Sequence, residues 1–297
     1  MPVEEITASA AGTWTLGDRT VRRMGFGSMR LTADPDRARA VRVLRRAVEL
    51  GVNHIDTAAF YVSPGGPLGV GTGAPRHATE LIREALAPYP DDLVIATKVG
   101  PSFDEATRHR ELTPAELRRE VEENLRRLGR DHLDVVNLRI VRRPGQDSVA
   151  ERFAALAELR DAGLIRHLGL SNVRVDHLHE ARAVAPVVCV QNAYAIEVNR
   201  WADELLRVCG ELGIAFVPFF AIAGAHREAG AGDDHDDALR AVARAHGASP
   251  HQIRLAWTLH QGPHVLAIPG TGDPEHLAQN VAAGAIRLSP DDLARLG

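Results

Sequence analysis

Short apolar runs alternate with amphipathic helical patterns along almost the whole chain. Eight of these runs are unbroken, as expected of strands that are buried on both faces. They occupy residues 24–29, 52–57, 93–99, 134–139, 165–172, 187–192, 214–220 and 265–270. Eight strand and helix pairs in roughly 250 to 300 residues, without a strongly polar linker, favour a (β/α)8 barrel over a doubly wound sheet. We therefore predict one barrel domain that spans residues 1–297.

Local signals mark the ends of several elements. Residues 13–23 predict a β-hairpin before the first barrel strand. Residues 62–76 are too rich in Gly and Pro for a helix or a central strand, and we expect a loop at the C-terminal mouth of the barrel. Four further segments place a capping side chain before a proline and predict helix starts. These segments are residues 113–116, 249–252, 273–275 and 289–291.

The composition is that of an ordinary globular protein and argues against two classes of partner. A formal net charge of −4 and a pI near 6.4 give no sequence support for binding to nucleic acid or to an anionic membrane surface. The longest apolar stretch, residues 212–225, has 14 residues and contains Pro218, so it is too short for a membrane span. The pattern of exposed residues does not predict an oligomeric state.

Two further features indicate the compartment. The acidic N-terminal segment lacks the basic and apolar parts of a signal peptide. Cys189 and Cys209 lie in separate apolar patterns and form neither a disulfide framework nor a metal cluster. We expect a protein of the reducing cytoplasm.

Lys98 is the only lysine of the chain, whereas 34 of the 35 basic residues are arginine. Lysine differs from arginine in being a compact charge that can pair closely with a neighbour or lose its proton when it is buried. The residue also ends the third apolar run, and strand ends are where α/β barrels keep their reactive groups. The alternative is that a high-GC coding bias converted almost every other lysine to arginine.

Three ionisable residues are predicted to meet at the mouth of the barrel. Asp56 ends the second strand, Tyr61 follows five residues later, and Lys98 ends the third strand. A tyrosine is a poor acid near neutral pH unless a nearby cation stabilises its phenolate, and Lys98 can be that cation. Asp56 would keep the lysine charged, so the three residues form a candidate proton donor. Alternatively, Asp56 caps the loop and the Tyr61 hydroxyl lies in water.

Several motifs carry a resemblance to a known family. They are GVNHIDTAAFY (51–61), VIATKVG (94–100), GLSN (169–172), VQN (190–192) and IPGT (268–271) followed by HLAQN (276–280). In this order they resemble the aldo-keto reductase superfamily. The resemblance implies a barrel that binds NADP(H) extended across its mouth, and a catalytic tetrad of Asp, Tyr, Lys and His. Asp56, Tyr61 and Lys98 match the first three members.

The fourth tetrad position departs from this pattern, because the fourth strand ends in Arg139 where the family usually has a histidine. Arginine cannot relay a proton, but it can bind a carbonyl or phenolate oxygen beside Tyr61. The sequence DVVNLR around it resembles a bacterial subgroup similar to pyridoxal reductases, which interconvert pyridoxal and pyridoxine. Another electron-rich aldehyde or ketone, such as an intermediate of specialised metabolism, suits the arginine equally.

The resemblance also assigns residues to the cofactor. Ser171, Asn172 and Gln191 would bind the nicotinamide carboxamide, although such polar residues also cap strand ends. Phe219 stands where an aromatic ring stacks on the nicotinamide, unless it belongs to the core.

A second group of residues is assigned to the phosphates. Gly270, Thr271 and Gly272 are expected to begin the helix that follows the eighth strand, where free N–H groups favour a phosphate. His276, Gln279 and Asn280 follow on this helix. The resemblance implies NADP(H) as the cofactor. Many relatives have a lysine in place of Gly270 and an arginine in place of His276, and both bind the 2′-phosphate of the cofactor. Because this chain lacks them, NAD(H) is not excluded.

The remaining histidines indicate no metal site, because none of them has a metal-ligand spacing on a predicted helix. His54 is expected to be a barrel residue with its hydrogen bonds satisfied. Besides a carbonyl reductase, two other functions remain open. One is a lyase that forms a Schiff base on Lys98, and the other is a regulatory subunit that senses the redox state of the cofactor.

Overall fold

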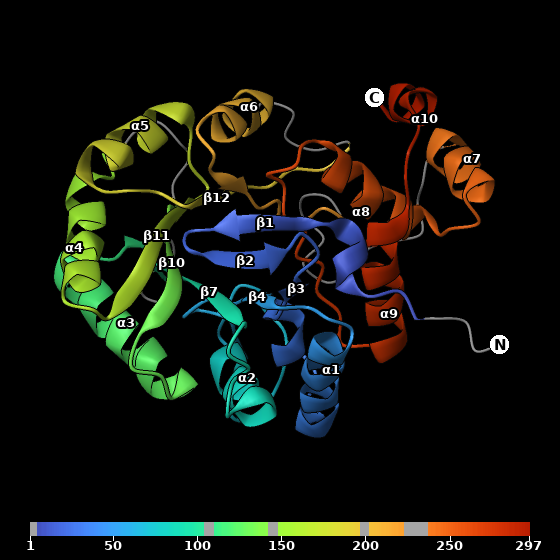
Figure 1. Cartoon of the computed structure of the whole chain (residues 1–297). Helices are drawn as coiled ribbons and strands as arrows, with labels where there is room; N and C mark the ends of the chain where they lie inside the picture. The colour runs from blue at the N-terminus through green and yellow to red at the C-terminus, as the bar shows by residue number, and fades with distance from the viewer. Residues whose placement is uncertain (1–4, 104–109, 142–147, 197–201, 223–236) are drawn as a thin grey trace.

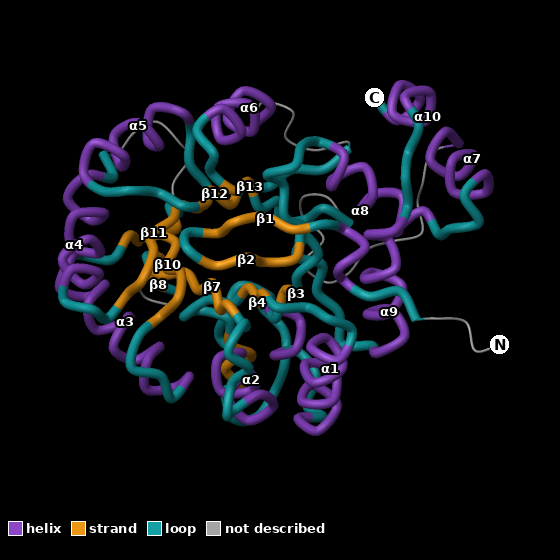
Figure 2. Tube along the Cα trace, in the orientation of Figure 1, coloured by secondary structure: helices purple, strands orange, loops and turns teal. Residues whose placement is uncertain are grey.

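A curled parallel sheet forms the centre of the molecule, and helices pack around its outer face (Figures 1 and 2). The computed structural model describes residues 5–103, 110–141, 148–196, 202–222 and 237–297. Seven strands pair in parallel in the order β13-β12-β11-β10-β7-β4-β3. These strands are β3 (Phe26–Gly27), β4 (His54–Asp56), β7 (Val94–Val99), β10 (Leu133–Arg139), β11 (Ile165–Ser171), β12 (Cys189–Gln191) and β13 (Ala215–Phe216).

The eighth predicted strand closes the barrel, but as two separate bridges rather than a continuous strand. Val265 pairs with Phe216 on one side, and Ala267 pairs with Met24 on the other, both in parallel. The prediction of a full strand was wrong because Pro269 has no N–H to extend the ladder. The first and last strands of the sheet are likewise shorter than their apolar runs. The result is a (β/α)8 barrel, as the sequence predicted.

Helices alternate with these strands and cover the barrel. They are α1 (Arg37–Glu49), α2 (Ala78–Leu86), α3 (Pro114–Leu128), α4 (Ala150–Asp161), α5 (Val175–Val184), α6 (Asp203–Glu211), α7 (Asp237–Ala245), α8 (Pro250–His260), α9 (Pro274–Ala282) and α10 (Pro290–Leu296). Three of the four predicted starts form capping boxes, in which a Thr or Ser side chain and the residue three positions on exchange hydrogen bonds, at α3, α8 and α10. None of the helices in the described part of the chain is long and apolar enough to cross a membrane.

The predicted N-terminal hairpin covers one end of the barrel. Its strands β1 (Thr13–Leu16) and β2 (Arg19–Arg22) pair antiparallel, and Figure 1 shows them lying across the sheet. Leu16 and Val21 are buried in one apolar cluster with Val94 of β7 and with residues of four other barrel segments. The hairpin therefore seals the end of the barrel that lies opposite to the carboxyl ends of the strands.

Strand periodicity places chemistry at the open end. Val94 and Ala96 belong to the inner cluster, so Lys98, two residues further along β7, also lies on the inner side. The same alternation puts Asp56 at the inner end of β4, and the register pairs Asp56 with Ala96. The apolar interior thus gives way to charged side chains at the carboxyl ends of the strands.

Two short antiparallel ladders border this open end. The Gly/Pro-rich insertion is joined at its base by β5 (Val62–Ser63) and β6 (Arg76–His77), a ladder that its composition did not predict. A second ladder pairs β8 (Pro101–Ser102) with β9 (Arg110–Glu111) just after β7. Both loops therefore start beside the strand ends that carry the charged residues.

His54 lies inside the barrel and contradicts the expectation of satisfied hydrogen bonds. Its side chain is 2 % exposed, and neither ring nitrogen has a hydrogen-bond partner among the described residues. Gly25 packs against the ring so closely that a Cβ there would stand 2.2 Å from Nε2. Burial lowers the pKa of His54 to about 4.

We expect His54 to make the fold sensitive to acid. The unfolded chain takes up a proton near the ordinary pKa of about 6.5, whereas the folded chain does so only near pH 4, so stability is lost as the pH falls through this window. A shift of this size corresponds to about 3 kcal/mol. Urea unfolding at pH 7.5 and pH 4.5 should show that the wild type loses about 2 to 3 kcal/mol more than His54→Gln. Equal losses would contradict this explanation.

Candidate active site

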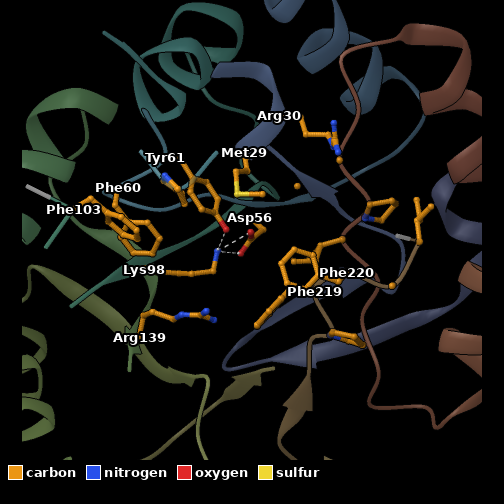
Figure 3. A pocket seen from close by; sticks show the side chains of 18 residues that line it. Met29, Arg30, Asp56, Phe60, Tyr61, Lys98, Phe103, Arg139, Phe219 and Phe220 are labelled. Carbon is orange, nitrogen blue, oxygen red and sulfur yellow. Dashed lines mark hydrogen bonds and ion pairs between the residues drawn. The ribbon is translucent and has the colours of Figure 1, made fainter. Parts of the chain in front are cut away.

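Lys98 is the centre of a buried polar cluster at the mouth of the barrel (Figure 3). Its Nζ donates to Oδ1 and Oδ2 of Asp56 at 2.7 and 2.8 Å, to the carbonyl oxygen of Thr57 at 2.9 Å and to the hydroxyl of Tyr61 at 2.9 Å. Lys98 and Asp56 are each 3 % exposed. Asp56 Oδ1 also accepts from Nε2 of Gln191 at 2.7 Å. The geometry thus brings the three predicted residues together.

The same contacts decide between the alternatives for Asp56 and Tyr61. The Asp56 carboxylate accepts hydrogen bonds from two side chains, so it does not act as a loop cap. The Tyr61 hydroxyl oxygen accepts a hydrogen bond from Lys98 and therefore keeps its own proton available for another acceptor. The Lys98 ammonium also lies 4.6 Å from the centre of the Tyr61 ring.

The electrostatics of the cluster keep Lys98 charged. Burial alone would lower the pKa of Lys98, but the charges of Asp56 and Tyr61 overcome burial and raise it above its ordinary value. A lysine held as ammonium is a poor nucleophile, which argues against Schiff-base chemistry. Burial also raises the pKa of Tyr61, while Lys98 and Arg139 oppose this effect. The expected fall in the pKa of this tyrosine is therefore not the net result, although Lys98 acts in the expected direction.

Arg139 ends β10 and lies beside this cluster. Its Nη1 donates to Oγ of Ser171 at 3.1 Å, and its Cζ lies 4.8 Å from the centre of the Phe219 ring. Burial lowers the pKa of Arg139, and Tyr61, Glu111 and Asp56 oppose this effect only in part. The guanidinium nevertheless stays charged at any accessible pH, because the pKa of arginine is very high to begin with.

An aromatic cavity opens above these residues. It encloses about 1210 Å³ of empty space, including solvent at its mouth. Phe60 and Phe103 form a wall on one side, with ring centres 5.1 Å apart, and Phe219 and Phe220 lie across the cavity from them (Figure 3). The lining also includes Met29, Arg30, Pro67 and Ile222. A flat ring could lie between these aromatic side chains while its substituents reach Tyr61 and Arg139.

The sequence did not reveal the residues that support this site. Gly100 follows β7 with a φ of 131°, and a Cβ there would stand 2.5 Å from the carbonyl oxygen of Arg139. Its N–H donates to Glu120 Oε2 at 3.0 Å, and burial raises the pKa of Glu120 to about 7. Glu111 of β9 accepts from the N–H of Val141 at 2.8 Å, just after β10. These contacts fix the loop after β7 against the end of β10. Of these features, only the glycine directly after the strand could have been recognised in the sequence.

The residues predicted to bind the carboxamide lie next to this cluster. Ser171 and Gln191 hydrogen-bond to Arg139 and Asp56, respectively. Asn172 has a φ of 61°, and its amide donates to the carbonyl of Ile140 at 2.8 Å, so its side chain caps a strand end. Phe219 lines the cavity rather than the core.

The predicted phosphate residues lie along the neighbouring rim, and one expectation was wrong. Helix α9 begins at Pro274, so Gly270, Thr271 and Gly272 precede the helix instead of starting it. Asp273 is the N-cap, and its carboxylate already accepts from the first free N–H groups, of Glu275 and His276. Gly270 lines the cavity, and Thr271 is buried. On α9, His276 and Gln279 are exposed and Asn280 is buried.

The donor set suits a nicotinamide better than a metal ion. Oε1 of Gln191 is buried and has no partner among the described residues, so it can accept a hydrogen bond from a carboxamide NH₂. Within the described ranges, no group of three or more His, Cys, Asp or Glu side chains could hold a metal ion.

Comparisons with known proteins agree with this geometry. The model of the aldo/keto reductase family matches residues 23–297. The chain is 41 % identical to pyridoxine 4-dehydrogenase of Escherichia coli K12, over 97 % of this chain and 98 % of the relative. It is 38 % identical to an uncharacterized oxidoreductase of Schizosaccharomyces pombe, over 98 % and 90 %. A crystal structure of an aldo/keto reductase from Klebsiella pneumoniae with NADP and acetate superposes with a TM-score of 0.75 at 28 % identity, over 96 % and 93 %.

The buried pair predicts a specific pattern of stabilities. Lys98→Met leaves the Asp56 carboxylate buried without a counter-charge and should cost about 3 to 5 kcal/mol. The double variant Asp56→Asn with Lys98→Met removes both charges and should be more stable than Lys98→Met alone. Urea unfolding of the two single variants and the double variant measures this coupling. If the stability loss of the double variant equals the sum of the losses of the two single variants, the pair does not interact in this way.

Proposed function

The chain belongs to the aldo/keto reductase family, and we propose that it uses NADPH to reduce pyridoxal to pyridoxine. Reduction of a carbonyl group with NADP(H) is the activity of the family. The observation that carries the assignment is the hydrogen bond from Lys98 to Tyr61 beneath an aromatic cavity. The choice of pyridoxal is supported by the 41 % identity to pyridoxine 4-dehydrogenase. We further propose that residues 1–297 act as one domain in the cytoplasm.

Tyr61 is the proton donor in this proposal. When it is bound, the cofactor supplies a hydride to the carbonyl carbon. Tyr61 gives its hydroxyl proton to the carbonyl oxygen, so that hydride and proton together convert the aldehyde to the alcohol. Lys98 donates to the Tyr61 oxygen, which turns the proton of that hydroxyl towards the cavity and stabilises the phenolate as it forms. Asp56 holds the ammonium in place.

Ser171, Asn172 and Gln191 are proposed to orient the carboxamide, and Phe219 to support the nicotinamide ring. The unpartnered Oε1 of Gln191 supports this arrangement. We propose that the phosphates lie along the rim beside Gly270, Thr271 and Gly272. The cofactor would then extend towards His276, Gln279 and Asn280 of α9. Asp273 already caps α9, so we expect the loop before the helix, rather than the helix terminus, to contact phosphate.

Arg139 is proposed to bind the oxygen next to the reacting carbonyl. Pyridoxal carries its aldehyde beside a phenolic hydroxyl on a flat pyridine ring. A guanidinium offers a fixed pair of donors to such an oxygen. The wall of Phe60 and Phe103 can stack on the ring at the same time.

The first test is turnover of pyridoxal with NADPH, followed by the absorbance of the cofactor. Tyr61→Phe should lower kcat by roughly 10² to 10⁴-fold, the usual contribution of a positioned acid. Tyr89→Phe is a matched control, because the Tyr89 hydroxyl donates to the carbonyl of Leu128 away from the cavity. Full activity of Tyr61→Phe would exclude tyrosine as the donor.

The second test addresses the phenolic oxygen. We expect wild type to prefer pyridoxal over pyridine-4-carbaldehyde, which lacks the neighbouring hydroxyl. Because a hydrogen bond to a charged group contributes about 1.5 to 3 kcal/mol, Arg139→Met should lower this preference in kcat/KM by about 10 to 100-fold. If the variant loses activity equally on both aldehydes, Arg139 does not recognise the phenolic oxygen.

A further inference from the structure

The contacts of Arg139 point towards the cofactor as well as the substrate. Its guanidinium hydrogen-bonds to Ser171 Oγ at 3.1 Å and lies over the Phe219 ring at 4.8 Å. Both of these residues belong to the proposed nicotinamide site. A nicotinamide ring that packs on Phe219 must therefore either lie beside the guanidinium or displace it. In both cases the charge remains next to the nicotinamide.

The charge of Arg139 is not neutralised by a neighbouring acid. Among the described residues, no carboxylate oxygen forms an ion pair with its guanidinium. Both oxygens of Asp56 already accept from Lys98, at 2.7 and 2.8 Å. Glu111 forms its ion pair with Arg152 instead. Lys98 and Asp56 cancel each other, so the cluster retains one net positive charge at Arg139.

We propose that Arg139 makes the protein bind NADPH more tightly than NADP⁺, so that the reduced form occupies the site when both forms are present. This inference rests on the proposed function, because it requires the nicotinamide to lie beside Phe219. The ring of NADPH is neutral, whereas loss of its hydride leaves a ring with one positive charge. A fixed cation next to the ring repels only the oxidised form, and this repulsion acts over the short distance between the guanidinium and a ring packed on Phe219.

The role differs from that of a histidine at the same position. A neutral histidine adds no charge beside the ring, whereas a guanidinium stays charged at every accessible pH. The substitution therefore changes the relative binding of the two cofactor forms without a change in the proton donor, Tyr61.

The experiment measures the dissociation constants of NADPH and NADP⁺ by calorimetry or by quenching of protein fluorescence. Wild type should bind NADPH more tightly than NADP⁺. We define the ratio as the dissociation constant of NADP⁺ divided by that of NADPH, and Arg139→Met should lower this ratio by about tenfold or more. Arg139→Lys keeps the charge and should retain the ratio within about threefold. Arg160→Met is a control, because it removes an arginine of α4 that pairs with Asp161 and does not line the cavity. It should leave the ratio unchanged.

Arg139→His gives a readout that a structural role would not produce. Its imidazole carries a positive charge only when it is protonated, which acidic pH favours. The ratio for this variant should therefore be high below pH 6 and fall above pH 8, whereas the ratio for wild type stays flat. Thermal unfolding of each variant shows whether it is folded under these conditions.

The outcomes separate the two proposals. If wild type binds neither nucleotide, the proposed function fails and this inference fails with it. If wild type binds both and Arg139→Met keeps the wild-type ratio, the proposed function stands and the inference is wrong. A pH-independent ratio for folded Arg139→His overturns it as well, and this arm decides the matter if Arg139→Met does not fold.

Discussion

The ion pair between Lys98 and Asp56 is the interaction on which the site depends. Two charges that are almost completely buried cost several kcal/mol of solvation each, and the pair tolerates this only when every polar atom is bonded. The structure meets the requirement with three elements. The carbonyl oxygen of Thr57 and the hydroxyl oxygen of Tyr61 each accept a hydrogen bond from the ammonium group. Gln191 donates a hydrogen bond to Oδ1 of the carboxylate. Because Tyr61 is one of the required partners, the stability of the pair and the orientation of the proton donor cannot be separated.

The barrel explains why these residues can meet although they are far apart in the sequence. Parallel strands bring their carboxyl ends to one edge, and the alternation of β-structure points every second residue inwards. The hairpin lies across the opposite end (Figure 1), where Leu16 and Val21 are buried against barrel residues. The fold could be predicted from the sequence because each strand is a separate apolar run and several helices begin with a cap and a proline. The closing segment was predicted too long, because Pro269 stops the ladder after the bridges to Met24 and Phe216.

The candidate site was predictable to a similar extent. Asp56, Tyr61, Lys98 and Arg139 were found because ionisable residues at the ends of apolar runs are unusual and match a family motif. His54 shows the limit of such reasoning, since the run predicted burial correctly but not the lack of partners for the ring. Phe60 and Phe103 form one wall only after two loops fold beside each other. Glu120 supports Gly100 from a helix that gives no sign of that role in its sequence. Contacts between loops depend on tertiary structure, and one sequence does not specify them.

The arginine in place of a histidine also changes how the proton must travel. A histidine can donate or accept a proton near neutral pH, whereas Arg139 can only donate hydrogen bonds. Lys98 is no substitute, because the carboxylate and the phenolic oxygen raise its pKa and its protons are directed at Asp56, Thr57 and Tyr61. In the proposed mechanism, the proton that is transferred to the carbonyl oxygen therefore comes from Tyr61. In this proposal Tyr61 recovers its proton after each turnover from water at the mouth of the cavity, which it lines beside Phe60 and Arg139. One side chain then positions the substrate and another moves the proton, and the proton enters through the cavity mouth rather than through the barrel interior.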